Sequence, residues 1–100
     1  MKETLQNIII ADENNYDLKI RNQNFSNEII FEKEIFTAII DWVNVSNCQF
    51  KTLDLLSNSF LECTFKRCKF EDGIFYKSQF CECIFENCQI INSEAIKIDF

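Results

Sequence analysis

Six cysteines are the residues of this 100-residue chain best suited to chemistry, because a thiolate can bind a metal or attack an electrophile, and paired thiols can form disulfides. Zinc sites favour cysteines two residues apart, or histidine partners, and the chain has no histidine. A disulfide framework needs an oxidising compartment, and the sequence carries no export signal. We therefore predict neither a metal site nor disulfides from these spacings: Cys63-x4-Cys68 and Cys81-x-Cys83-x4-Cys88.

No other residue pattern indicates catalysis. The single glycine excludes a glycine-rich phosphate loop, and no nucleophile is spaced with a candidate base. The acid pairs Asp12–Glu13 and Glu71–Asp72 are typical of a solvated surface. We predict that the chain is not an enzyme and has no catalytic residue and no cofactor.

Charge and hydropathy indicate the cellular location of the protein and the class of its partner. A net charge of −6 disfavours direct binding to nucleic acid and favours a basic protein partner. No apolar run reaches membrane-spanning length, and Leu5–Ala11 is too short and too interrupted to be a signal peptide. We expect a cytoplasmic protein with no membrane contact.

An internal repeat of five residues organises the chain. Every fifth residue from Ile20 to Phe100 is apolar, and nine of the eleven phenylalanines lie in this register. Neither a helix, with its period of 3.6, nor a strand, with its period of 2, produces this pattern. A second register, two residues before the first, holds small residues from Ala38 to Ser93 and includes five of the six cysteines. The chain therefore repeats one five-residue unit.

A large apolar residue with a small residue two positions earlier resembles the pentapeptide-repeat family. Its clearest copies here are Cys63–Arg67, Cys68–Asp72 and Cys83–Asn87. The resemblance implies an all-β fold, a right-handed quadrilateral β-helix of about four coils. Residues twenty apart would then stack at the strand spacing, with the phenylalanines and small residues inside. Stacked cysteines would lie too far apart for disulfides, and only Cys81 would be an exposed thiol.

We interpret residues 1–100 as a single domain, in which residues 1–14 form an N-terminal cap, 15–45 degenerate coils and 46–100 regular coils. Asn7–Ala11 is expected to be a short capping strand. The first coil is expected to be irregular, because the small positions there hold larger or charged residues. These are Leu18, Gln23, Glu28 and Lys33. No cap follows Phe100, so a homodimer through the C-terminal end is possible.

The outer surface is the candidate functional site. The position after each central residue is apolar in every coil along one column, which we call the apolar stripe, and the position before it is mostly acidic. Exposed apolar side chains of this kind mark protein interfaces. The alternatives are that the N-terminal residues cover this stripe, or that it mediates self-association. The predicted partner-binding residues are Phe36, Leu56, Tyr76 and Ile96 of the stripe, with Glu34, Asp54 and Glu94 beside it and Trp42 as a further anchor. Glu32, Glu34 and Asp41 form a second acidic cluster, which Glu28 would join if it points outward.

Two functions from different classes suit such a surface. A small acidic protein of this kind would serve as an immunity protein that binds and neutralises a basic bacterial toxin domain. The family resemblance implies an alternative, because some pentapeptide-repeat proteins mimic DNA and bind type II topoisomerases. Lysines such as Lys51 and Lys69 interrupt the negative field that such mimicry needs. A structural self-assembly module is the third possibility.

Overall fold

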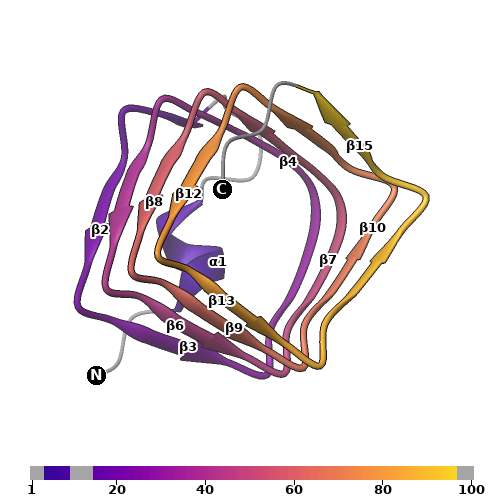
Figure 1. Ribbon diagram of the computed structural model, residues 1–100, viewed down its shortest axis with the longest axis horizontal. Helices are drawn as coiled ribbons and strands as arrows, with labels where there is room; N and C mark the ends of the chain where they lie inside the picture. The colour runs from indigo at the N-terminus through magenta and orange to yellow at the C-terminus, as the bar shows by residue number, and fades with distance from the viewer. Residues whose placement is uncertain (1–3, 10–14, 97–100) are drawn as a thin grey trace.

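The computed structural model describes residues 4–9 and 15–96, and it shows a four-sided β-solenoid of stacked coils (Figure 1). The predicted fold is therefore confirmed. The strands of successive coils pair in parallel with partners twenty residues apart, as in Phe60 with Phe80 and Val45 with Phe65. Two of the sequence interpretations rest on residues outside the described part of the chain, namely Asp12–Glu13 and Phe100.

The four sides form three sheets, because two long strands, β4 and β7, run through a corner and join two sides. The seven-stranded sheet contains β1 (Asn15–Tyr16), β4 (Ile29–Phe36), β7 (Gln49–Leu56), β10 (Lys69–Glu71), β11 (Ile74–Tyr76), β14 (Gln89–Ile91) and β15 (Glu94–Ile96). The second sheet contains β2 (Lys19–Arg21), β5 (Ile39–Asp41), β8 (Ser59–Leu61) and β12 (Gln79–Cys81). The third contains β3 (Asn24–Ser26), β6 (Asn44–Ser46), β9 (Thr64–Lys66) and β13 (Ile84–Glu86).

Each corner uses a left-handed backbone residue, and the chain makes these turns without glycine. Every fifth residue from Asp17 to Asn92 has a φ between 49° and 59°. This conformation costs an L-amino acid roughly 1–2 kcal/mol. The next coil offsets the cost, because the corner N–H donates to a carbonyl of that coil, as Trp42 N does to Leu61 O at 2.8 Å. The one glycine, Gly73, serves close packing instead, since a Cβ there would lie 2.4 Å from Leu53 O.

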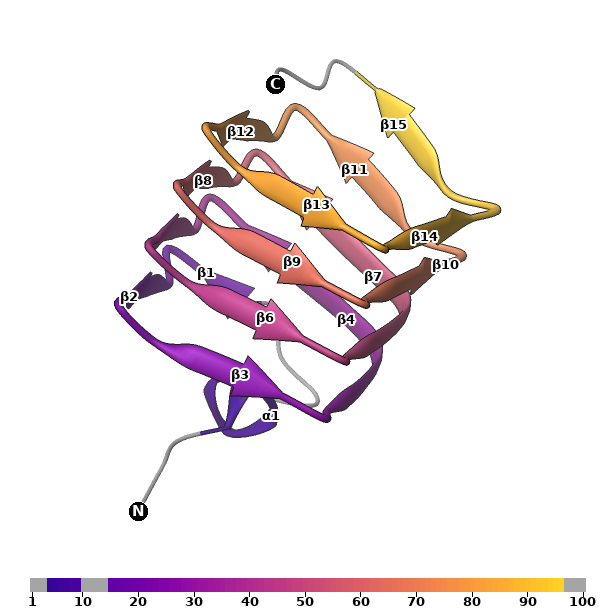
Figure 2. The same ribbon diagram turned by 60° about the horizontal axis from the view of Figure 1, so that its bottom comes forward.

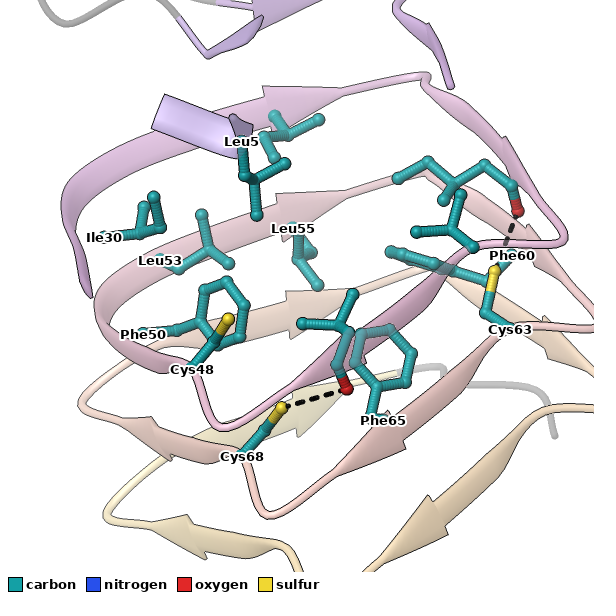
Figure 3. Packing of buried hydrophobic residues seen from close by; sticks show 14 of the residues in the cluster. Leu5, Ile30, Cys48, Phe50, Leu53, Leu55, Phe60, Cys63, Phe65 and Cys68 are labelled. Carbon is teal, nitrogen blue, oxygen red and sulfur yellow. Dashed lines mark hydrogen bonds between the residues drawn. The ribbon is translucent and has the colours of Figure 1, made fainter. Parts of the chain in front are cut away.

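The interior contains stacked columns of the central residues (Figure 3). Phe50 and Phe70 stack with ring centroids 4.9 Å apart, and Phe60 and Phe80 at 4.6 Å. The small register fills the space beside these columns, and one of its members, Asn58, is a buried polar residue. Its amide nitrogen donates to Ile35 O and its amide oxygen accepts from Ala38 N, both in the preceding coil, so its polar atoms are satisfied. These contacts join neighbouring coils into one core.

The expected irregularity of the first coil is wrong at the level of the backbone. The corner turns at Asp17, Asn22 and Asn27 have the same φ as those of later coils. The exceptional side chain is Glu28, which is only 8% exposed and points inward, so it does not join the outer acidic cluster. Its two carboxylate oxygens accept hydrogen bonds from Leu5 N and Gln6 N, both at 2.9 Å. The degeneracy of this coil is therefore confined to side chains.

A short helix, α1 (Leu5–Ile8), replaces the strand predicted over Asn7–Ala11, of which residues 10 and 11 lie outside the described part. It lies at the N-terminal end of the coils (Figure 2), within the outline of the four sides (Figure 1). Thr4 caps it by accepting from Asn7 N, and the Glu28 carboxylate binds two more of its N–H groups. Helical spacing places Leu5 and Ile9 on one side, and both are buried in the core.

Candidate protein-binding surface

Strand pairing in the seven-stranded sheet aligns the apolar stripe. Phe36 pairs with Leu56, Leu56 with Tyr76, and Tyr76 with the backbone of Ile96, on strands β4, β7, β11 and β15. Phe36, Leu56 and Tyr76 each follow an inward-pointing central residue, so alternation along the strand turns their side chains outward. The structure therefore brings the predicted stripe together on one side of the solenoid.

The structure adds Tyr16 to the apolar stripe. Tyr16 on β1 pairs with Phe36, and the two rings stack with centroids 4.8 Å apart and planes inclined by 18°. The Tyr16 side chain is 59% exposed, whereas Phe36, Leu56 and Tyr76 are half-buried against their neighbours. An aromatic residue at this end supplies a large contact area with little conformational freedom to lose. The same twenty-residue spacing could have identified Tyr16 from the sequence.

Carboxylates lie along one edge of the apolar stripe. Glu34 pairs with Asp54, Asp54 with Ile74, and Ile74 with Glu94 in the same ladder. Glu34 and Glu94 are exposed, whereas Asp54 is half-buried and accepts a hydrogen bond from Ile74 N at 3.1 Å. Lys77 lies over the Tyr76 ring at 5.3 Å, which shows that this aromatic face accommodates a cation. The surface thus combines apolar and aromatic contact area with negative charge.

Trp42 does not belong to this surface. It is 54% exposed at the corner between β5 and β6, which belong to the other two sheets. Its neighbours in the same corner column are Glu62 and Glu82 of the following coils. The hydrogen bond between the side chains of these two glutamates raises the pKa of Glu62. Trp42, which the sequence suggested as a further anchor, therefore lies apart from the apolar stripe.

Cations neutralise much of the remaining acidic surface. Asp41 of the second acidic cluster accepts from Arg21 at 3.4 Å, and it lies in a different sheet from Glu34. Glu71 is within 4 Å of two lysines, with Nζ–Oε distances of 3.8 Å to Lys51 and 3.3 Å to Lys69. These ion pairs reduce the negative charge at Asp41 and Glu71.

Five of the six cysteines lie in the small register inside the coils, and Cys81 is exposed. Cys48, Cys63 and Cys68 are buried, Cys83 and Cys88 are half-buried, and all six are free thiols. Four of these thiols, those of Cys63, Cys68, Cys83 and Cys88, donate to backbone carbonyls of the preceding coil. Cys63 does so to Ile40 at 3.2 Å and Cys68 to Val45 at 3.5 Å (Figure 3). Burial raises the pKa of Cys63 and of Cys68 to about 11, so both thiols stay protonated at neutral pH.

We expect a thiol-specific reagent to divide the cysteines into three groups in the native protein. Cys81 is exposed and should react fast, the half-buried Cys83 and Cys88 should react more slowly, and the three buried thiols should react only on unfolding. Time-resolved thiol titration with and without denaturant measures these groups, and a Cys81→Ser variant identifies the fast one. Rapid reaction of all six thiols in the native protein would contradict the inward register.

The described residues contain no group of three or more histidine, cysteine, aspartate or glutamate side chains that could hold a metal ion. Within the same part of the chain, no helix has the length and apolar character needed to cross a membrane.

Comparison with known proteins adds no functional assignment. Neither a protein-family model nor a curated protein sequence matches the chain. Among solved structures, a trypsin-treated form of QnrB1, a plasmid-mediated fluoroquinolone resistance protein, aligns with 74% of the chain at 14% identity and a TM-score of 0.26. The alignment covers 54% of that protein, about half its length. The TM-score is too low to support an inference from this similarity, so the fold is assigned from the observed strand register.

Proposed function

We propose that this chain is a non-enzymatic, protein-binding member of the pentapeptide-repeat group, and that it acts as an immunity protein by binding a basic bacterial toxin domain. The main support for the proposal is the apolar stripe, which continues through every coil and has carboxylates along one edge. A partner that presents lysines and arginines around an apolar centre would complement both features.

The chemistry of the stripe favours a protein over a small molecule. Interface energy is concentrated in a few aromatic anchors that become fully desolvated, and Tyr16, Phe36 and Tyr76 are aromatic. The exposed carboxylates of Glu34 and Glu94 would steer a basic partner and fix its orientation, while the apolar centre would supply most of the affinity. The net charge of −6 adds to this steering.

The alternative function, DNA mimicry toward a type II topoisomerase, needs a continuous negative field. The ion pairs of Lys51 with Glu71 and of Lys66 with Glu86 weaken that field on two sides of the solenoid. These pairs therefore favour the toxin-binding proposal. Topoisomerase binding and self-assembly remain distinct outcomes of the same experiment.

The test is affinity capture from a lysate of the source organism, including the product of any adjacent reading frame. Recovery of a small basic toxin at one-to-one stoichiometry supports the proposal. Recovery of a topoisomerase subunit instead supports DNA mimicry, and recovery of the chain alone supports self-assembly. Each of the last two results contradicts the immunity function.

We expect Tyr76→Lys to weaken binding of the captured partner at least tenfold, because it places a charge in the centre of the apolar stripe. The melting temperature should stay close to that of the wild type, since the Tyr76 side chain points outward. Phe31→Lys is the matched control, because Phe31 is 54% exposed on another side of the solenoid. Titration calorimetry measures both variants. Equal loss of affinity in the two would place the interface elsewhere, and a large fall in stability would show that the stripe is covered.

A further inference from the structure

The interior of the solenoid contains an apolar cavity of about 160 Å³. Its lining extends from Leu5 and Ile9 at the N-terminal end to Ile90 and Ala95 in the last described coil. Ser93 is its one polar lining residue in the described part, and the Ser93 hydroxyl already donates to Ile91 O at 3.1 Å. A void of this size is exceptional, because protein cores seldom leave gaps larger than a water molecule.

The central register offers a physical reason for unfilled space in the second coil. In the third coil three successive edge-to-face contacts join four phenylalanines, with centroids 6.1, 5.9 and 5.7 Å apart between neighbours from Phe60 to Phe75. In the second coil three of the four positions hold smaller side chains, namely Ile40, Val45 and Leu55. The parallel ladders hold the two coils to the same outline, so the second coil cannot contract to fill the difference.

We propose that this cavity is a binding site for a small, neutral, apolar molecule about the size of one aromatic ring. An engineered cavity of about 150 Å³ lined by similar side chains stays dry and binds benzene or xenon. The cavity here has a comparable volume and lining, and it offers no charged group to a polar ligand. The lining residues Phe85 and Ile90 are 37% and 58% exposed, so the proposal places the route of entry on their side of the cavity.

Benzene is the probe, and methyl-labelled wild-type protein is the sample. We expect saturable chemical-shift changes at the lining methyls of Val45, Leu53 and Leu55, and none at the exposed Ile29 on the outer surface. The melting temperature should rise with benzene concentration, because the ligand binds only the folded state. Absence of saturable shifts at the lining methyls would overturn the proposal. Lining shifts that follow protein concentration instead would identify a second copy as the occupant and would also overturn it.

The Val45→Phe variant tests where in the protein benzene binds. The new ring would lie between Phe25 and Phe65 in the same column, and we expect it to fill the void and weaken benzene binding at least tenfold. Ser46→Phe is the matched control, because it adds the same ring one residue away on the outer surface. If Val45→Phe does not fold, Leu55→Phe, in the column below Phe75, provides the same test. Unchanged affinity in the folded filling variant would show that benzene binds elsewhere.

Discussion

Replacement of Phe65 by alanine is expected to lower the free energy of unfolding by about 3–5 kcal/mol, the usual cost of removing a buried aromatic ring. Phe65 is 6% exposed and stacks on Phe85 with centroids 5.0 Å apart. It also contacts Phe60 and Phe70 edge to face within its own coil. The substitution would therefore remove contacts both along the column and around the ring, in the coil that is most completely packed.

Urea denaturation followed by far-ultraviolet circular dichroism measures this effect. Phe31→Ala is the matched control, because Phe31 is 54% exposed and its loss should change stability by no more than about 0.5 kcal/mol. Phe85→Ala should give a value between the two, since Phe85 is 37% exposed in the last described coil. If Phe65→Ala unfolds at the urea concentration of the wild type, the inward register is wrong.

The intermediate loss of stability expected for Phe85→Ala shows what the five-residue register does not predict. The period of five places Phe65 and Phe85 in equivalent positions and assigns both the full cost of a buried ring. Burial, however, depends on whether a coil packs on both sides of the residue. Phe65 has Val45 and Phe85 as its two column neighbours, whereas Phe85 pairs only with Phe65 among the described strands. The register thus predicts that a side chain points inward and which column it joins, but it does not predict how deeply that side chain is buried.

The register also predicted most of the candidate interface, for a simple physical reason. Each five-residue unit makes one side and one corner, so residues twenty apart must align, and the apolar stripe follows by counting. Tyr16 was missed because its unit has Asn15 at the central position, where the rest of the register is apolar. The structure buries Asn15, and its amide donates to Glu34 O at 3.1 Å. A polar residue can occupy an inward position when a backbone group satisfies it.

The local sequence pattern did not predict the helix α1. Ile8 and Ile9 are β-branched and favour a strand in isolation, which is why the sequence suggested one. The contact that decides the conformation is distant, because Glu28 lies more than twenty residues away and binds the first N–H groups of the helix. This contact is tertiary, and a repeat period does not describe it.

Replacement of Glu28 by alanine is the second large effect that we expect, with a loss of about 2–4 kcal/mol. Hydrogen bonds to a charged group contribute about 1.5–3 kcal/mol, and a buried donor left without an acceptor costs about 1–3 kcal/mol. The variant would remove both acceptors from Leu5 N and Gln6 N, and it would free the segment that buries Leu5 and Ile9. Glu32→Ala is the control, because Glu32 is an exposed acid in the same coil.

Urea denaturation gives the total effect of the Glu28 variant, and amide hydrogen exchange locates it. We expect Leu5 and Gln6 to lose protection first, followed by the strands of the first coil, because these strands pack on the side chains that α1 supplies. Glu28→Gln keeps the shape but leaves only one acceptor oxygen, so it should lie between alanine and the wild type. If Glu28→Ala removes protection from α1 alone and leaves the urea midpoint unchanged, then the coils are stable without the helix, and the buried carboxylate serves only to hold α1 in place.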